Sequence, residues 1–432
     1  MQSREWVPSS FVADYVRDDL HARLRLSNGV NCFETRVELA SGDIDPHHAW
    51  WHSYTMGKHL EFPTPTKSLR VADLFCGPGG LSQGTSLAAK ALGYKVQHQF
   101  AVDVDQDALR VFSANHFPKL AINDSAASLV SYTLRESENK VEFHGTPTIR
   151  DERVEALRDQ VDMLIAGPPC QGHSTANKNR KFFEHKNLLY LTVPALAVAL
   201  NVKFVIIENV PGVTASEQGV AQRAWKLLEN HGYKLTGSVL NAAQLGWAQR
   251  RRRYFMIASQ VEQPLDLKRI ILPALRGDEM AIRDLLSDLV DADQSNFMTT
   301  LPDLSYENVE RIRVLHEDDL YDLPDEHRNP SAKEKGTTYR SVYGRMYWDR
   351  PAQTITTGFM TPGRGRYVHP LRHRTLFPLE AARLQGFPDS YVFDAYGEEP
   401  IRTALARWIG DAVPAPLGFA AAISALFPSA VL

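Results

Sequence analysis

Short apolar runs alternate with helical segments between residues 69 and 259 of the chain. Buried strands are predicted at 69–75, 98–104, 161–167, 203–210 and 254–259. Helices are predicted between them, at 81–93, 105–116, 189–201 and 223–233. Strands that are apolar on both faces and alternate with helices are typical of a parallel sheet covered on both sides. The pattern therefore predicts an α/β fold with a doubly wound sheet.

The pattern changes on both sides of this region, which predicts a division into domains. Residues 1–67 form an N-terminal extension of unknown role that ends at a proline-marked break. Residues 68–259 form the main domain. Residues 260–403 are polar and rich in proline, and they predict a smaller domain with one clear helix at 281–289. Residues 404–432 are apolar and predict one more buried helix that returns to the main domain.

An aromatic run within the extension, HHAWWHSY from His47 to Tyr54, contains several histidines. Histidine is a common metal ligand, so a metal site is one interpretation of the run. The run has no frame of cysteines or carboxylates, which favours a packed or interfacial aromatic cluster instead. We therefore expect no bound metal.

Composition excludes several classes of protein. The 432 residues carry a net charge of −3 and are 44% hydrophobic, which excludes dominant disorder and a strongly basic coat for nucleic acid. Local basic patches are not excluded. Three separated cysteines, with no CxxC pair, exclude a disulfide scaffold and indicate a reducing compartment. We find neither a signal-peptide core nor an apolar run of the roughly 18 residues that a membrane helix needs. We expect a cytoplasmic protein with no membrane partner.

A glycine-rich turn, CGPGG, follows the first predicted strand. Gly77, Gly79 and Gly80 allow the backbone to turn sharply and to approach a ligand closely. Asp103 ends the second predicted strand, where an acidic side chain can accept hydrogen bonds from ribose hydroxyls. Pro78 removes an N–H donor from the turn, which argues against a phosphate cradle. The arrangement favours a cofactor such as S-adenosylmethionine over NAD, and the chain has no P-loop motif.

Candidate catalytic side chains follow the later strands. Cys170 comes directly after a buried strand, in the turn GPPCQG. Ligands of open parallel sheets bind at the carboxyl ends of the strands, so we expect this nucleophilic thiol at the same edge as the glycine turn. Glu208 ends an apolar strand, and a carboxylate in that position is usually paired or catalytic. In the run Arg250–Arg253, alternate residues share a face, so Arg251 and Arg253 could point together into the site and bind a phosphate or an acidic group.

These residues belong to a series of motifs that resembles the S-adenosylmethionine-dependent cytosine-5 DNA methyltransferases of bacterial and phage type. In the order of the family, the matching segments are DLFCGPGGLSQG, AVDVDQDAL, the pair Asn123–Asp124, GPPCQGHS, IIENVPG, QRRRRYF, RPAQTITTG, LEAARLQGFPDSYVF and IGDAVP. The resemblance implies that residues 68–259 form a Rossmann-like methyltransferase sheet and that residues 260–403 form a target-recognition domain.

The resemblance implies a cofactor site for S-adenosylmethionine, with S-adenosylhomocysteine as the product. Asp103 would hold the ribose, and Asp124 would contact the adenine amine. The other residues that would line this site are Phe75, Gly77, Gly79, Gly80, Leu81, Val104, Pro169, Asp411 and Val413.

The resemblance also implies catalytic and DNA-binding side chains. Cys170 would form a covalent bond with carbon 6 of a flipped cytosine, and Glu208 would hold that base. Arg251 and Arg253 would contact the base and order the site. Contacts with DNA would come from Gln171, Ser174, Lys178, Arg180, Lys181, Arg250, Thr354, Arg364 and Arg366, with Arg372 and Arg374 as further candidates. Residues that could read bases are Tyr306, Asn308, Arg311, Arg313, Lys333, Lys335 and Arg340.

Two departures from the family pattern bear on function. Asp411 stands where the family usually has asparagine, so an amide donor is lost and a negative charge is added beside the cofactor. Residues 125–161 are longer than expected and contain a charged insert, RESENKVEFHG, that predicts a surface hairpin.

Three other interpretations compete with this one, and the sequence disfavours each of them. The tRNA-modifying branch of the family is expected to carry a Cys-Phe-Thr motif in the recognition region, which contains no cysteine here. A catalytically silent DNA-binding homologue is favoured only by Asp411, and a dinucleotide-dependent oxidoreductase leaves Cys170 unexplained. The resemblance implies a methyltransferase of double-stranded DNA, expected to be a monomer, in a restriction–modification system with a cognate restriction endonuclease as a further partner.

Overall fold

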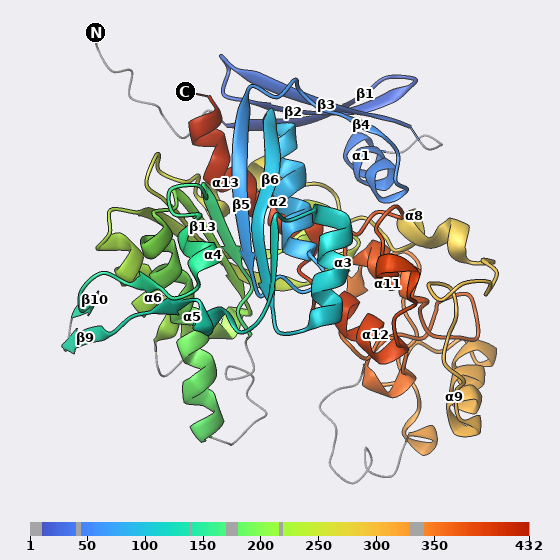
Figure 1. The fold of residues 1–432 in the computed structure, drawn as a ribbon. Helices are drawn as coiled ribbons and strands as arrows, with labels where there is room; N and C mark the ends of the chain where they lie inside the picture. The colour runs from blue at the N-terminus through green and yellow to red at the C-terminus, as the bar shows by residue number, and fades with distance from the viewer. Residues whose placement is uncertain are drawn as a thin grey trace.

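The computed structural model describes residues 11–39, 45–137, 140–169, 180–215, 219–328 and 341–431. Its central sheet has seven strands in the order β14-β16-β13-β12-β5-β6-β7. Figure 1 labels β13, β5 and β6 of this sheet. The apolar runs predict β5 (Lys67–Leu74), β6 (Tyr94–Asp103), β12 (Met163–Ala166), β13 (Phe204–Asn209) and β16 (Arg252–Ser259), and these strands are confirmed. The predicted α/β fold is therefore confirmed.

The two edge strands of this sheet and one strand direction differ from the prediction. The apolar pattern misses β7 (Leu120–Asn123) and β14 (Lys234–Asn241), because edge strands are only partly buried and lack a continuous apolar run. β16 is antiparallel to both β13 and β14, whereas the pattern predicts parallel strands. The connection from β14 to β16 spans only residues 242–251, which is too short for the crossover that a parallel pair requires.

Helices cover both faces of the sheet. α2 (Gly80–Ala91), α3 (Gln106–His116) and α13 (Ala415–Ala430) share one hydrophobic core with alternate strand residues such as Ile206. α5 (Arg180–Leu200) and α6 (Val220–Glu229) share the second core with the intervening residues, such as Ile207. Side chains of a strand point alternately to its two faces, so continuously apolar strands feed both cores.

The N-terminal extension packs on the main domain and is not a separate tail. β1 (Val12–Arg17), β2 (His21–Ser27), β3 (Cys32–Glu38) and β4 (Leu60–Glu61) form an antiparallel sheet beside α1 (Pro46–Thr55), at the top of Figure 1. Trp50 and Trp51 of α1 are buried, and Trp51 lies 5.6 Å from the ring of Phe419 in α13. The prediction of a packed aromatic cluster is confirmed.

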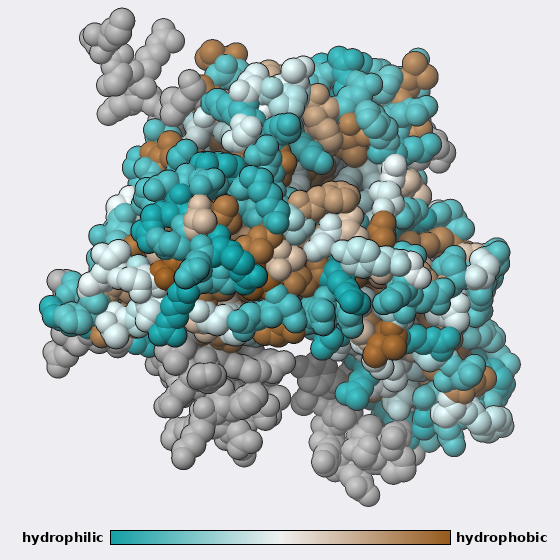
Figure 2. All heavy atoms as spheres, viewed as in Figure 1, coloured by the Kyte–Doolittle hydropathy of each residue, from teal (hydrophilic) through white to brown (hydrophobic). Residues whose placement is uncertain are grey.

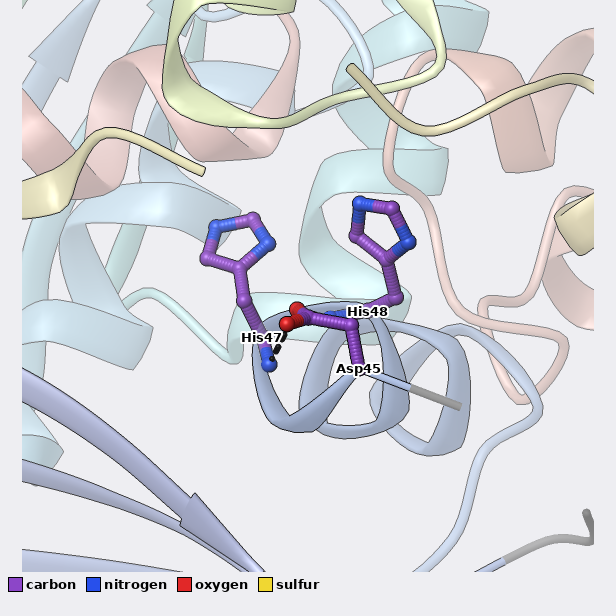
Figure 3. Close-up of side chains that lie close together, drawn as sticks. All are labelled: Asp45, His47 and His48. Atoms are coloured by element: carbon purple, nitrogen blue, oxygen red, sulfur yellow. Dashed lines mark hydrogen bonds between the residues drawn. The ribbon is translucent and has the colours of Figure 1, made fainter. Parts of the chain in front are cut away.

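The start of α1 brings together Asp45, His47 and His48 (Figure 3), which carry potential metal-ligand atoms within 4.8 Å of one another. The Asp45 carboxylate caps the helix by accepting hydrogen bonds from the backbone N–H groups of His47 and His48. His48 Nε2 lies 2.7 Å from the carbonyl oxygen of Asp278, and the buried His47 ring packs edge-on against Tyr15. These contacts give the group a structural use in joining α1 to the rest of the protein.

The region 260–403 contains short helices and a small core of its own. The structure has α7 (Leu272–Leu275), α8 (Arg283–Leu286), α9 (Tyr306–Glu317), β17 (Ala352–Gln353) and α11 (Pro378–Leu384). The helix predicted at 281–289 is shorter than expected, since α8 ends at Leu286 and a 3-10 turn follows. α9 is not predicted by the apolar pattern. It packs through Ile312 and Leu315 in the small core.

The C-terminal stretch forms two helices where one is predicted. α12 (Arg402–Asp411) ends before Pro414, and α13 begins after it. A proline disfavours helical geometry at the residue that precedes it, so Pro414 separates the two helices. Residues 402–430 are long and apolar enough to cross a membrane, which the search for apolar runs did not predict. However, 94% of the most apolar 18-residue stretch of this segment is buried inside the protein. Such burial is typical of a core helix, and hydrophilic side chains predominate on the face shown in Figure 2.

The remaining elements lie mainly around the charged insert. β9 (Leu134–Ser137) and β10 (Lys140–Phe143) form an antiparallel hairpin, which confirms the prediction for this insert. The other short elements are β8 (Val130–Ser131), β11 (Thr148–Ile149), α4 (Glu152–Glu155) and β15 (Gln249–Arg250).

Trp51→Ala should lower the free energy of unfolding by about 3–5 kcal/mol, because it leaves a cavity in the core between α1 and α13. Urea denaturation followed by circular dichroism measures the change. Val30→Ala is the control, since Val30 is 84% exposed and surface changes stay within about 0.5 kcal/mol. Equal stability of both variants would show that the extension does not stabilise the main domain.

Candidate active site

A cavity of about 400 Å³ lies at the carboxyl ends of β5, β6, β12 and β13. Its size is within the usual range of small-molecule sites, and this edge of a doubly wound sheet is where ligands bind. The predicted residues that line it are Phe75, Gly77, Gly80, Leu81, Asp103, Val104, Pro169, Glu208, Arg251, Arg253, Asp411 and Val413. Sequence reasoning missed further lining residues, which include Asp73, Cys76, Pro78, Asp105, Asn209, Arg407 and Trp408.

The glycine turn forms one wall of the cavity. Gly77 and Gly79 have φ angles of 50° and 101°, in the left-handed region that glycine adopts without strain. A Cβ atom on Gly80 would lie only 2.7 Å from the carbonyl oxygen of Val413. Gly79 caps α2 and does not itself line the cavity. The turn therefore needs glycine both for its shape and for the close approach of the C-terminal segment.

Asp103 ties the end of β6 to the glycine turn. One of its carboxylate oxygens accepts a hydrogen bond from the backbone N–H of Gly77 at 2.8 Å, and the other accepts one from the backbone N–H of Asp105 at 2.8 Å. Burial raises the pKa of the Asp103 carboxyl. Each carboxylate oxygen has a further lone pair, so the group can still accept a hydrogen bond from a ligand.

Asp73 is a buried acid in the cavity wall that the sequence analysis did not single out. One carboxyl oxygen accepts a hydrogen bond from the Ser82 hydroxyl at 2.7 Å, and Oδ1 has no partner among the described residues. Burial, with a smaller contribution from the nearby Asp103, raises its pKa to about 8. The signal that could have revealed it is an acidic residue inside an otherwise apolar strand.

Glu208 and Arg253 form a buried ion pair at the other side of the cavity. Glu208 is the penultimate residue of β13 (Phe204–Asn209), and its Oε1 lies 2.8 Å from Nε of Arg253 in β16. Burial raises the pKa of Glu208, although Arg253 and Arg251 oppose this shift. Burial therefore favours the neutral form of this carboxyl group, and the two arginines favour the charged form.

Arg251 lines the cavity but is committed to backbone carbonyl groups. Its guanidinium donates to the oxygens of Ile355 at 2.6 Å, Gly410 at 3.0 Å and Asp411 at 3.3 Å. Burial lowers its pKa to about 9. These bonds fix two segments at the cavity edge, while Nε has no partner among the described residues, so a contact of Arg251 with a phosphate or an acidic group stays a prediction.

Asp411, which stands where the family usually has asparagine, lies among positive charges. Burial raises the pKa of its carboxyl group, while Arg251, Arg407 and Arg253 lower it. Asp411 lines the cavity beside these three arginines. Their charges offset part of the negative charge that distinguishes this position.

Asp124 does not lie at the cavity in the described part of the chain. It is exposed directly after β7, and its carboxylate accepts hydrogen bonds from the backbone of Ser125 and the hydroxyl of Ser128. The carboxylate closes its own turn, and its contact with an adenine amine stays a prediction.

The structure describes only some of the residues predicted to contact DNA or the base. Cys170, Gln171, Ser174 and Lys178, with the base-reading candidates Lys333, Lys335 and Arg340, lie outside the described residues. Arg180 and Lys181 begin α5, but their side chains are not described. Arg250 is exposed and pairs with Glu279, and the Thr354 hydroxyl donates to the Arg250 carbonyl at 2.9 Å.

Two arginines predicted to contact DNA are internal. Arg366 is 8% exposed and donates to the carbonyl oxygens of Tyr321 and Arg345 while it pairs with Asp322. Arg374 is held by the buried Glu380. Both guanidinium groups hold oxygens of the smaller region in this structure, and their contacts with DNA stay predictions.

Other arginines of this region stay at the surface. Arg364 is exposed. Arg372 pairs with Asp291, and on α9 Arg313 pairs with Glu310. Surface pairs of this kind are weak and can exchange for contacts with phosphate.

The mostly parallel sheet and the cavity at its carboxyl edge are typical of a Rossmann-like fold, in which ligands bind at this edge. Residues 69–425 match the model of the family described as C-5 cytosine-specific DNA methylase. The chain belongs to this family and is a DNA cytosine-5 methyltransferase.

Individual relatives agree with the family match. The Type II methyltransferase M1.BsuMI of Bacillus subtilis is 37% identical over 362 residues, which cover 84% of this chain and 81% of the relative. The Type II methylase M.HgiDII of Herpetosiphon aurantiacus is 29% identical, over 81% of this chain and 92% of the relative. The S. pombe Dnmt2 methyltransferase is similar in fold, with a TM-score of 0.56 and 20% identity over 84% of this chain and 99% of that one.

Asp73→Asn should change how stability depends on pH. With a folded pKa of about 8, against 3.8 for the free side chain, the folded protein holds a proton that the unfolded chain releases between these pH values. This group therefore makes the free energy of unfolding fall as pH rises through that window, by on the order of 1 kcal/mol per pH unit. Urea titrations of both proteins at pH 5 and pH 7.5 should show a smaller loss in the variant. Parallel pH profiles would contradict the assignment.

Arg366→Gln should lower the free energy of unfolding by about 2–3 kcal/mol, because it leaves buried carbonyl groups without a donor. Arg364→Gln is the matched control and should change stability by less than about 0.5 kcal/mol. Thermal and urea denaturation compare the two variants. If Arg364→Gln were the more damaging change, the internal role of Arg366 would be wrong.

Proposed function

We propose that this chain transfers a methyl group from S-adenosylmethionine to carbon 5 of a cytosine that is flipped out of a short duplex DNA sequence. The reaction would pass through a covalent adduct with Cys170 and serve a restriction–modification system. The observation that carries the proposal is the single cavity shared by the glycine turn and the Glu208–Arg253 pair. Cofactor and base would thereby meet at the carboxyl edge of the sheet.

The residues of the cavity suit S-adenosylmethionine. Asp103 keeps lone pairs free for ribose hydroxyls, and Asp73 Oδ1 is a buried polar atom without a partner among the described residues. Pro78 and the acidic character of the wall disfavour a phosphate group, which agrees with a cofactor that has none. When bound, S-adenosylmethionine supplies an electrophilic methyl group.

The chemistry of cytosine explains why the site needs a thiol and a buried acid. Carbon 5 of cytosine is a poor nucleophile until the Cys170 thiolate adds to carbon 6 and turns the ring into an enamine. Glu208 would hydrogen-bond to ring nitrogen 3 and the exocyclic amine, and would stabilise the charge that develops there. Its raised pKa favours the protonated form that can donate to nitrogen 3. After carbon 5 gains the methyl group, a base removes the carbon-5 proton, and the Cys170 thiolate leaves.

Arg251 and Arg253 would act differently in this site. Arg253 would orient Glu208 through their ion pair. Arg251 would order the wall of the site through the carbonyl groups of Ile355 and Gly410. Flipping a base costs a few kcal/mol, which contacts of surface side chains such as Arg250 and Arg364 with the DNA backbone would offset.

The biological setting rests on the relatives. M1.BsuMI and M.HgiDII carry Type II names, which supports a restriction–modification role with a cognate endonuclease. A monomer in the cytoplasm fits this role. A tRNA substrate is disfavoured, because the recognition region of this chain lacks the Cys-Phe-Thr motif. A catalytically silent homologue is favoured by Asp411 alone.

Cys170→Ala should abolish methyl transfer and keep cofactor binding, because only the nucleophile is removed. The test expresses wild type and variant in a cell that lacks cytosine methylation and sequences its DNA after bisulfite treatment. We expect methylcytosine at one recurring short sequence with the wild type only.

Two outcomes would overturn parts of the proposal. Comparable methylation by Cys170→Ala would exclude this thiol as the nucleophile. A folded wild type that leaves the DNA unmethylated, yet binds S-adenosylhomocysteine in calorimetry, would move the assignment to an RNA substrate or a silent homologue.

A further inference from the structure

Tyr391 and His116 make a buried contact behind the glycine turn. Tyr391 follows α11, and its hydroxyl donates a hydrogen bond to the carbonyl oxygen of Pro78. His116 ends α3, and its Nε2 lies 3.0 Å from the same hydroxyl. Both side chains are buried, at 8% exposure or less. The hydroxyl has one hydrogen, which it donates to the carbonyl oxygen of Pro78.

The glycine turn fits tightly against these two side chains. A Cβ atom on Gly79 would lie 2.5 Å from His116 Nε2 and 2.7 Å from the Tyr391 hydroxyl. Pro78 has no N–H, so its carbonyl group is the only backbone polar group through which this residue can be anchored. Pro78 also lines the cavity, next to Gly77. The hydroxyl of Tyr391 therefore acts on the wall that faces the cofactor.

Tyr391 is held on a rigid support. Its ring packs against those of Phe387 and Phe393, with centroids 4.6 Å and 5.3 Å away. The next residue, Val392, exchanges two hydrogen bonds with the side chain of Asn115 in α3, at 2.9 Å and 2.8 Å. A side chain that is fixed in this way can impose a position on the turn that it contacts.

We propose that Tyr391 is a positioning residue for the cofactor, whose hydroxyl holds the Pro78 carbonyl and keeps the glycine turn in its binding shape. The inference rests on the proposed function, because it takes the cavity as the site of S-adenosylmethionine. The sequence assigns residues 260–403 to target recognition. According to this proposal, the segment around Tyr391 also helps to form the cofactor site.

Tyr391→Phe tests the proposal, since it removes the hydroxyl and keeps the packed ring. The dissociation constant for S-adenosylhomocysteine, measured by calorimetry without DNA, should rise about three- to tenfold, as expected for one lost hydrogen bond. The KM for S-adenosylmethionine should rise in parallel, while kcat at saturation stays within about twofold. Tyr396→Phe is the control and should match the wild type, because Tyr396 is 77% exposed on a neighbouring turn.

An unchanged dissociation constant in Tyr391→Phe, or a fall in kcat with an unchanged KM, would overturn the proposal. If that variant does not fold, His116→Gln repeats the comparison, and wild-type affinity in it would equally overturn the proposal. Failure of the proposed function is distinct, since it would appear as wild-type protein that binds S-adenosylhomocysteine and leaves DNA unmethylated.

Discussion

The cavity depends on the direct packing of the α2 backbone against the α13 backbone. A Cβ atom on Gly84 would lie 2.2 Å from the carbonyl oxygen of Ala415, and one on Gly80 would lie 2.7 Å from that of Val413. At this distance the C-terminal segment reaches the glycine turn and adds Asp411 and Val413 to the cavity wall. The candidate site is thus assembled from both ends of the main domain.

Arg251 is the second constraint on the same region. Its buried guanidinium joins the carbonyl groups of Ile355 and of Gly410, which belong to segments far apart in the chain. Both bonds are donated by Nη1, and hydrogen bonds from a charged donor are stronger than neutral ones, so this arginine holds both segments in place. With the glycine contacts, it brings parts of the smaller region and of the C-terminal helices to one edge of the sheet.

The features that follow from local pattern could be predicted from the sequence. Continuous apolar runs identify the central strands, and the spacing from the glycine turn to Asp103 places both at the cavity. The edge strands β7 and β14 escape this reasoning because exposure breaks their apolar pattern. Arg364 and Arg366 are alike in sequence, but only Arg366 meets the carbonyl groups of Tyr321 and Arg345 from distant segments. Partners of this kind depend on tertiary structure, as does the bond between Tyr391 and Pro78.

The central claim is that the cavity between the glycine turn and the C-terminal segment binds the methyl donor. Calorimetric titration of S-adenosylhomocysteine into the wild type and Gly80→Ala tests it most directly, with thermal melts to establish that both proteins are folded. The account predicts one bound molecule per wild-type chain and an affinity at least about tenfold weaker in the variant, because the added methyl group displaces Val413 from the wall. Equal affinities in two folded proteins, or no binding to the wild type, would contradict it.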